Sequence, residues 1–214
     1  DETMARTIYG FTPESFDDRY REPEYHYGTA PNAFLVSQKH RFRPGMKALL
    51  PGDGEGRNGV WLAAQGLAVT TFDPSPFGVG KALKLAAENG VSIAAHRAGV
   101  ESWDWQEGEF DVVGLFYIHL PQALRKAAHA NALRTLKPGG MVILETFSPR
   151  QIEMRKLGAA GGPKEIDRLF TCEMLRADFA GAQFPVLEET EADFDGHAHH
   201  GRCGVVRMVA LKPA

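Results

Sequence analysis

Apolar runs alternate with helical patterns along the chain from residue 46 onward. The apolar runs predict strands at about 46–51, 68–73, 91–97, 110–117 and 140–147. The segments between them predict helices at about 57–66, 76–89 and 121–136. This alternation is typical of an α/β fold, in which helices cover both faces of a mostly parallel sheet. The nearly continuous apolar runs VSIAAH and FDVVGLFYIHL are expected of strands that are covered on both faces.

The pattern changes after residue 148. Residues 148–165 are rich in glycine and weakly periodic, so we expect a loop or lid with one helical turn. The stretch TCEMLRADFA has helical spacing, and Thr171 is suited to cap its amino end. The last apolar segments, FPVLEETEADFDG and RCGVVRMVALKP, are joined by the polar GHAHHG. They predict an antiparallel hairpin that lies against the parallel sheet.

The first 45 residues differ from both regions. TPESFDDRYRE predicts a short helix with Thr12 as its N-cap, and a second helix is expected from about Pro31 to Pro44. We expect residues 1–45 to form a helical cap over the carboxyl edge of the sheet. Residues 46–214 are then the cofactor-binding domain, as a single structural unit.

Composition limits the class of protein. The 214 residues include 24 Lys and Arg and 27 Asp and Glu, a formal charge of −3 that gives no electrostatic footprint for nucleic acid. Only two cysteines occur, which favours a reducing cytoplasm over a disulfide scaffold. No apolar run approaches the roughly 20 residues of a membrane span. We expect a cytoplasmic monomer or homodimer with neither nucleic acid nor membrane as its partner.

One glycine-rich stretch allows two cofactors: ALLPGDGEGRNGVWLAAQGLAVTTFDPS, residues 48–75. The spacing of Gly54, Gly56 and Gly59 is that of a dinucleotide fingerprint, and the spacing of Gly52, Gly54 and Gly56 is that of a methyltransferase nucleoside loop. Asp73 ends the second predicted strand, nineteen residues past Gly54. A carboxylate there can accept both hydroxyl hydrogens of an adenosine ribose, which suits NAD and S-adenosylmethionine equally.

The residues between the glycines distinguish the two cofactors. Asp53 and Glu55 place two carboxylates where a dinucleotide would put its pyrophosphate. At about 4 Å, each pair of like charges costs roughly 1 to 4 kcal/mol, depending on exposure. S-adenosylmethionine has no phosphate and carries two positive groups, so charge favours it. Gly59 is then a small residue that lets the first helix pack on the sheet.

GDGEGRN, FDPS, HLP and LKPGG, in this order, make residues 16–212 resemble a class I S-adenosylmethionine-dependent methyltransferase. Within that superfamily the chain is most similar to the small-molecule branch around tellurite-resistance and thiopurine-type enzymes. The resemblance implies a Rossmann-like sheet of seven strands with the last one antiparallel. Two stretches depart from the usual pattern. Leu50-Pro51 stand where many such enzymes have an acidic residue before the glycine loop. Ala98-Gly99-Val100-Glu101 follow the third strand where many have an acidic residue near the adenine, so either Glu101 or a backbone N–H is expected at the adenine edge.

The cofactor contacts are expected in the glycine loop and at the ends of the second, third and fourth strands. These residues are Gly52, Asp53, Gly54, Glu55, Gly56, Arg57, Asn58, Asp73, Pro74, Ser75, Gly99, Val100, Glu101, Phe116 and Tyr117. Trp103 and Trp105 either flank the adenine or pack in the core.

Three residues are candidates for catalysis: His119, Tyr27 and His199. His119 follows the fourth strand and either faces the acceptor or is satisfied by backbone at a helix start. Tyr27 lies in the aromatic group Tyr25, His26 and Tyr27 of the cap, which either closes over the methyl group or packs on the sheet. His199 belongs to the hairpin loop with His197 and His200, where a base, a metal ligand and a solvated loop are the alternatives. No cysteine or carboxylate spacing completes a zinc site, so no metal is expected.

The predicted function is methyl transfer from S-adenosylmethionine to a small acceptor: a thiol, a metalloid or halide anion, an amine or a lipid headgroup. No nucleobase-type Asn-Pro-Pro-Tyr motif is present. The alternatives are a non-catalytic S-adenosylmethionine sensor and, less favoured by the charges, an NAD-dependent oxidoreductase.

Overall fold

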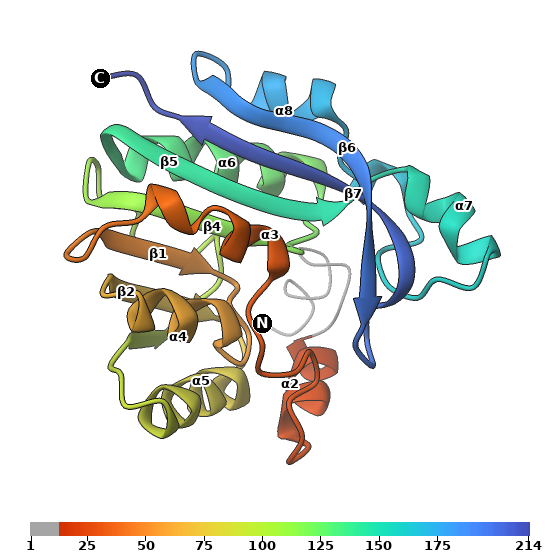
Figure 1. Cartoon of the computed structure of the whole chain (residues 1–214), viewed down its shortest axis with the longest axis horizontal. Coiled ribbons are helices and arrows are strands. Elements are labelled where there is room, and N and C mark those ends of the chain that lie inside the picture. Colours follow the sequence, from red (N-terminus) through yellow and green to blue (C-terminus); the bar gives the residue numbers. More distant parts are fainter. Residues whose placement is uncertain (1–12) are drawn as a thin grey trace.

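The computed structural model describes residues 13–214, with side chains from residue 16. One seven-stranded sheet has the order β3-β2-β1-β4-β5-β7-β6 (Figure 1). Its strands are β1 (Lys47–Pro51), β2 (Ala68–Asp73), β3 (Ala94–Arg97), β4 (Phe110–Phe116), β5 (Leu136–Phe147), β6 (Gln183–Asp195) and β7 (His200–Leu211). β1 to β5 pair in parallel, whereas β7 is antiparallel to both β5 and β6. The predicted α/β fold with an antiparallel carboxyl-terminal hairpin is confirmed.

Helices cover both faces of the sheet (Figure 1). They are α2 (Pro13–Arg21), α3 (Ala33–Ser37), α4 (Arg57–Ala64), α5 (Pro76–Glu88), α6 (Gln122–Thr135), α7 (Arg150–Lys156) and α8 (Cys172–Asp178), with 3-10 turns η1 (Lys39–Arg41) and η2 (Ile166–Arg168). α3 and α4 contribute to the apolar cluster on one face, and α6 and α8 to the cluster on the other. α2 packs against α5 rather than on the sheet.

The central strands are mostly apolar because they are covered on both faces. Leu49 packs with Val113 and Leu144 in one cluster, and its neighbour Leu50 packs with Val112 in the other. Each such fully buried side chain contributes about 1.5 to 3 kcal/mol to folding. These strands form a rigid base from which the loops at their carboxyl ends project.

Two predicted boundaries differ from the structure, one before β3 and one between α6 and β5. β3 begins at Ala94 rather than 91, because the N–H of Val91 closes the end of α5 by donating to Ala86. The helix predicted to 136 ends at Thr135, because Leu136 already pairs with Phe110 as the start of β5. The LKPGG segment then bulges out of the strand before the regular pairing resumes at Met141.

The amino-terminal region is less helical than predicted. α2 matches the expected short helix, but its expected N-cap, Thr12, lies outside the described residues. The helix expected from Pro31 to Pro44 is wrong: Asn32 caps the five-residue α3, and a separate 3-10 turn follows. The side chains of Phe34 and Leu35 reach the core, which anchors this segment against the sheet.

The elements predicted after residue 148 are present, and one of them, α7, is longer than predicted. α7 occupies seven residues of the expected loop, which is longer than the single turn predicted. Thr171 caps α8 by accepting from the N–H of Met174, as expected. Within residues 13–214, no helix combines the length and apolar character that crossing a membrane requires.

A buried ionic group joins α6 to α8. Asp178 Oδ2 accepts from Arg125 Nε and pairs with His129 Nδ1, each at 2.8 Å. All three side chains are at most 5% exposed. The carboxylate therefore satisfies two cationic or polar groups that would otherwise be buried without a partner.

Candidate active site

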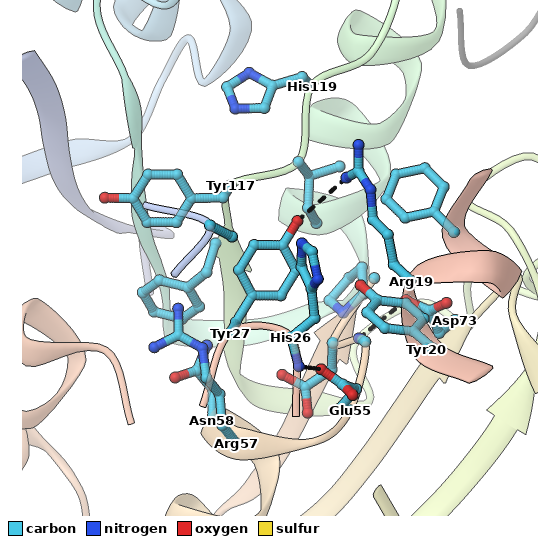
Figure 2. Close-up of a pocket in the computed structure, with 18 of the residues that line it drawn as sticks. Arg19, Tyr20, His26, Tyr27, Glu55, Arg57, Asn58, Asp73, Tyr117 and His119 are labelled. Atoms are coloured by element: carbon cyan, nitrogen blue, oxygen red, sulfur yellow. Dashed lines mark hydrogen bonds between the residues drawn. The ribbon is translucent and has the colours of Figure 1, made fainter. Parts of the chain in front are cut away.

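A cavity of about 430 Å³ opens at the carboxyl ends of β1 and β4, where the strand order reverses (Figure 2). Ligands of open α/β sheets bind at such a switch point. One end of the cavity is lined by the loop after β1 and the end of β2. The other end is lined by residues 26–28 of the cap, residues 161–163 and the hairpin tip at 198–199. Segments that lie far apart in the sequence thus line one space.

The glycine loop needs its glycines for two different reasons. Gly52, Gly54 and Gly56 have φ of 57°, 56° and 89°, a region that other residues rarely adopt. A Cβ on Gly56 would lie 2.6 Å from the Cβ of Ala82, so this glycine lets α4 and α5 approach. Gly59 behaves as predicted: a Cβ there would lie 2.7 Å from Thr71, where α4 packs on the sheet.

Asp73 is held by the backbone at the end of β2. Its Oδ2 accepts from the N–H of Gly54 and its Oδ1 from the N–H of Ser75, both at 2.9 Å. The side chain is 6% exposed and lines the cavity with Pro74. Burial raises the pKa of Asp73 to about 6, while the two N–H donors oppose the rise. The carboxylate is thus fixed in one orientation, with lone pairs left for a ligand.

The two acidic residues of the loop are engaged by protein groups. Asp53 Oδ2 accepts from the N–H of Gly59 at 3.1 Å and so caps α4, and burial raises its pKa to about 8. Glu55 pairs with Lys81 at 2.7 Å and accepts from the N–H of His26 at 2.7 Å. The repulsion expected between these residues and a pyrophosphate is therefore weaker than the bare sequence suggests.

The next two residues of the loop bind the cap. Asn58 Oδ1 accepts from the N–H of Asn32 at 2.8 Å, and Arg57 Nη1 donates to the carbonyl of Ala30 at 3.2 Å. Both side chains also line the cavity.

Three expected cofactor residues do not line the cavity. Gly56 serves packing, Ser75 orients Asp73 and caps α5, and Glu101 is exposed after the turn that follows β3. Gly99 and Val100 do line it. Both tryptophans pack in the core: Trp103 stacks on Phe72 at 4.6 Å, and Trp105 donates to the carbonyl of Val100 at 3.0 Å.

Tyr117 follows β4 in a left-handed conformation with φ of 55°, the one non-glycine residue in the described chain with positive φ. Its hydroxyl donates to Glu145 Oε1 at 2.6 Å, and Asn32 Nδ2 donates to the same oxygen at 2.9 Å. Arg207 pairs with the other oxygen of Glu145 at 2.6 Å. This network joins the cavity wall to the cap and to β7, and Phe116 lines the cavity beside it.

His119 lines the cavity, but both of its ring nitrogens are engaged. Nδ1 lies 3.1 Å from the carbonyl of Arg168, and Nε2 lies 3.2 Å from Thr146 Oγ1. Burial lowers the pKa of His119 to about 4, so the ring is neutral near pH 7. In that tautomer Nδ1 donates and Nε2 accepts, which agrees with a histidine satisfied by its surroundings.

His199 is largely buried at the cavity, unlike the other two histidines of the hairpin loop. Its ring lies among those of Tyr27, Tyr117 and Phe147, with centroids 4.8 to 5.1 Å away, and lines the cavity. Burial lowers the pKa of His199 to about 3. His197 and His200 are exposed. No group of three or more His, Cys, Asp or Glu side chains within the described residues is arranged to hold a metal ion.

The cap, residues 1–45, contributes more residues to the cavity than the sequence predicted. Of its three aromatic candidates, His26 and Tyr27 line the cavity, whereas Tyr25 packs on α5, where its hydroxyl lies 3.4 Å from the carbonyl of Lys81. Arg19 and Tyr20 of α2 were not predicted, yet both line the cavity. Their spacing from Phe16 on one helical face was the available signal.

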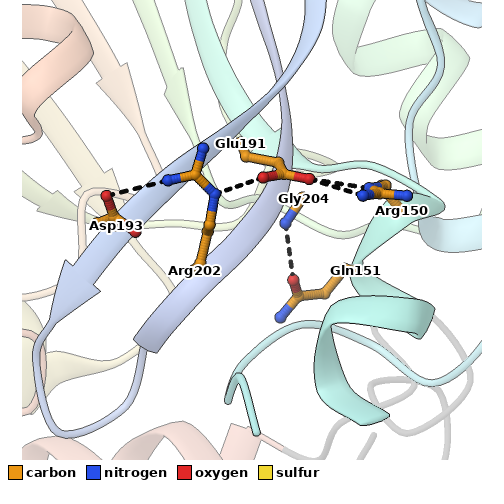
Figure 3. A network of polar contacts seen from close by, with 6 residues as sticks. All are labelled: Arg150, Gln151, Glu191, Asp193, Arg202 and Gly204. Atoms are coloured by element: carbon orange, nitrogen blue, oxygen red, sulfur yellow. Dashed lines mark hydrogen bonds and ion pairs between the residues drawn. The ribbon is translucent and has the colours of Figure 1, made fainter. Parts of the chain in front are cut away.

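Ion pairs anchor the hairpin that carries His199. Glu191 on β6 pairs with Arg150 of α7 and with Arg202 on β7, and Arg202 also reaches Asp193 (Figure 3). Gln151 Oε1 accepts from the N–H of Gly204 at 3.0 Å. α7 thereby holds the hairpin at its middle, and the tip extends to the cavity.

Residues 49–140 match the family described as the methyltransferase domain. The matched segment begins inside β1 and ends in the LKPGG bulge, so it contains the glycine loop, Asp73 and His119. Over these residues the chain is similar to a methyltransferase domain. This match supports S-adenosylmethionine as the cofactor and gives no support to the NAD alternative. No curated protein matches the chain in sequence.

Several solved structures share most of the fold. A protein solved in work on the conversion of a disulfide bond into a thioacetal group during echinomycin biosynthesis has a TM-score of 0.73, at 21% identity over 94% of this chain and 92% of that one. TehB from Haemophilus influenzae has a TM-score of 0.65, at 17% identity over 94% and 67%. A SAM-dependent methyltransferase from Methanosarcina mazei has a TM-score of 0.64, at 16% identity over 86% and 99%. At these identities the likeness establishes the fold.

The site fits this cofactor by its own geometry. Gly52 and Gly54 line the cavity in conformations that keep the backbone bare, and a Cβ on Gly54 would lie 2.7 Å from the Tyr20 hydroxyl. Asp73 presents an oriented carboxylate beside them. These are the features that a nucleoside with a ribose diol requires.

Proposed function

We propose that the methyltransferase domain methylates a small molecule that is bound at the aromatic end of the cavity. The observation that carries the proposal is the continuity of one cavity of about 430 Å³ from Asp73 to His199. This volume lies toward the lower end of the roughly 300 to 1,000 Å³ typical of ligand pockets. Cofactor and acceptor must share it, so the acceptor is small.

One group of residues binds the cofactor and a second group binds the acceptor. The glycine loop, Asp73, Gly99 and Val100 hold the nucleoside, as expected from the sequence. Bound S-adenosylmethionine supplies a methyl group activated by a positively charged sulfur. Tyr27, Tyr117 and His199 contact the acceptor from the opposite side, and their rings orient it toward the cofactor end.

Positioning and exclusion of water are the contributions that the chain makes to such a transfer. Residues 26–28, 161–163 and 198–199 converge on the aromatic end from three separate segments. Tyr117 is fixed by its bond to Glu145, and His199 is fixed by packing against three rings. A methyl acceptor placed between them meets rigid walls and little solvent.

The test compares cofactor binding by the wild-type protein with that by Asp73→Asn, which keeps the shape of the side chain and removes its charge. We expect calorimetry to show S-adenosylhomocysteine binding to the wild type and at least tenfold weaker binding to the variant. The control is Asp193→Asn at an exposed position, which should bind normally.

Two results would overturn parts of this proposal. If Asp73→Asn binds S-adenosylhomocysteine as tightly as the wild type does, Asp73 does not hold the nucleoside. Normal cofactor binding without methylation of any thiol, amine or anion in a panel of small acceptors would favour a sensor, the alternative that binding alone does not exclude.

A further inference from the structure

Five rings at the aromatic end of the cavity form one packed group. The ring of His199 has its centroid 4.8 to 5.1 Å from those of Tyr27, Tyr117 and Phe147. The ring of His119 stacks on the ring of Phe147, with centroids 5.8 Å apart and planes at 17°. All five residues line the cavity, and three of them, Tyr27, Tyr117 and His119, are labelled in Figure 2. A ligand at this end therefore meets ring faces and edges, which favour flat apolar molecules.

Three of the polar rings in this group already have hydrogen-bond partners within the protein. The hydroxyl of Tyr117 donates to Glu145. Both ring nitrogens of His119 are engaged by protein atoms. The hydroxyl oxygen of Tyr27 accepts from Arg19 Nη1. None of these rings depends on a ligand for its first hydrogen bond.

The wall at residues 161–163 presents its polar oxygens to α7. Arg155 Nη1 lies 2.8 to 3.3 Å from the three carbonyl oxygens of this segment, and Gln151 Nε2 donates to the first of them at 3.1 Å. The segment packs closely on the ring group, because a Cβ on Gly161 would lie 2.8 Å from Cδ2 of His199. This wall therefore lies against His199 while its carbonyl oxygens are held by α7.

The charged side chains at this end are also engaged by the protein. Burial lowers the pKa of Arg57, and the negative charges of Asp53 and Glu145 oppose this change. Arg19 donates to the hydroxyl of Tyr27. An ionised acceptor would lose its hydration here without meeting an unengaged opposite charge among the described residues, which is costly. An uncharged acceptor avoids that cost.

His199 is the polar ring of the group that has no hydrogen-bond partner. Within residues 13–214, neither of its ring nitrogens forms a hydrogen bond. Burial lowers the pKa of His199 to about 3, so near pH 7 the ring is neutral, with a hydrogen on one nitrogen and a lone pair on the other. A largely buried group in this state gains stability from a ligand that supplies the missing bond.

We propose that the methyl acceptor is an uncharged ring compound whose hydroxyl group donates a hydrogen bond to His199 and is the group that is methylated. This inference rests on the proposed function and names the class of its small acceptor: a phenol or another flat ring with a neutral hydroxyl. A hydroxyl fits a lone-pair acceptor better than a thiol does, because S–H is a weak donor. Ring hydroxyl compounds therefore join the thiols, amines and anions as acceptors to be assayed.

Methyl transfer to such a hydroxyl balances with His199 as the proton acceptor. A lone pair of the hydroxyl oxygen forms the new bond to the methyl carbon, the carbon–sulfur bond breaks, and its electron pair neutralises the sulfonium. The proton of the hydroxyl passes along the hydrogen bond to the free nitrogen of His199. An oxygen that bears both the new methyl group and its proton is a strong acid, so even a weakly basic imidazole accepts that proton.

The experiment uses three ring probes that differ at one position: para-fluorophenol, para-fluorotoluene and para-fluorobenzoate. Each is titrated into the protein saturated with S-adenosylhomocysteine, and fluorine NMR measures its affinity. We expect para-fluorophenol to bind at least fivefold more tightly than para-fluorobenzoate. His199→Phe should weaken binding of para-fluorophenol about fivefold, the effect of one lost hydrogen bond, and leave binding of para-fluorotoluene within twofold.

Two other histidine variants serve as comparisons. His26→Phe removes the other cavity histidine whose ring has no hydrogen bond within the described part of the chain. His197→Phe changes an exposed histidine of the same hairpin loop. Both variants should bind para-fluorophenol within twofold of the wild type.

A second measurement does not depend on the folding of His199→Phe. In the wild-type protein with nitrogen-15 in its histidine rings, para-fluorophenol should shift the ring-nitrogen signal of His199, and para-fluorotoluene should shift it much less. Equal shifts with the two probes would contradict a hydrogen bond to this ring.

Four results of the titrations would each overturn the proposal. These are para-fluorobenzoate binding as tightly as para-fluorophenol, equal effects of His199→Phe on the phenol and the toluene, loss of phenol binding in His26→Phe instead, and binding of none of the probes. Failure of S-adenosylhomocysteine to bind would instead contradict the proposed function. The same titrations into the cofactor-free protein would then decide whether His199 binds a ring hydroxyl.

Discussion

The hydroxyl of Tyr117 donates a hydrogen bond of 2.6 Å to Oε1 of Glu145, and this bond joins the cavity wall to the buried carboxyl end of β5. Tyr117 needs such a partner because its left-handed backbone is strained by about 1 to 3 kcal/mol. Glu145 also binds Arg207 and Asn32, so one carboxylate connects the cavity, the cap and the hairpin.

Glu145→Gln is expected to lower the free energy of unfolding by about 3 kcal/mol, because it leaves the largely buried Arg207 without its counter-charge. Urea denaturation measures the change. Glu191→Gln, which breaks ion pairs of exposed arginines, should cost less than about 1 kcal/mol. Equal effects of the two substitutions would show that Glu145 is not a buried anchor.

Gly56→Ala is expected to destabilise the protein by about 2 to 4 kcal/mol, since it combines an unfavourable positive φ with overlap against Ala82. Thermal unfolding of the cofactor-free protein measures it. Gly80→Ala is the matched control: it lies within α5 with no atom within 4 Å of its new Cβ, so it should stabilise by up to about 1 kcal/mol. A tolerated alanine at position 56 would contradict the close packing of α4 on α5.

Asp53 is expected to make the cofactor-free protein less stable as the pH rises. Its folded pKa of about 8 exceeds its usual value of 3.8, so between these values the folded state binds more protons than the unfolded state, and stability falls with increasing pH. Asp53→Asn should therefore gain stability over the wild type from pH 5 to pH 8, with the difference smallest near pH 4. Chemical denaturation at each pH measures this difference in stability. A difference that becomes smaller toward pH 8 would contradict the prediction.

Asp178→Asn is expected to cost about 3 kcal/mol, because Arg125 and His129 would lose the negative charge between α6 and α8. Unfolding in urea reports the loss. The exposed Asp18→Asn on α2 should change stability by less than about 0.5 kcal/mol. A cost at position 178 as small as that at position 18 would mean that the buried group contributes no net stability.

Local patterns predicted the features that depend on a few neighbouring residues. The apolar runs of β1 and β4, the glycine turn and Asp73 at the end of β2 all lie where the sequence indicated. The polar segment GHAHHG correctly marked the tip of the hairpin. Each of these depends on turn geometry or on burial of a short segment, which adjacent residues specify.

Long-range partners were not predictable in the same way. The sequence shows Glu55 in the glycine loop but not its ion pair with Lys81, which lies on the next helix and reduces the repulsion expected there. Nor does it show that Arg19 of α2 reaches Tyr27, or that Tyr117 bonds to Glu145 on the strand that neighbours β4. Such pairs depend on how helices and strands pack, which no local pattern records.

The two ends of the cavity are encoded in separate parts of the chain. Residues 51–75 build the end with Asp73, whereas the aromatic end combines the cap, residues 161–163 and the tip of the hairpin. Of the tip residues 196–199, His199 alone packs on an apolar cluster, through Phe147 and Tyr117. Under the proposed function, sequence changes there alter what is methylated while the nucleoside pocket and the fold persist, so this scaffold can evolve new acceptors by exchanging short loops.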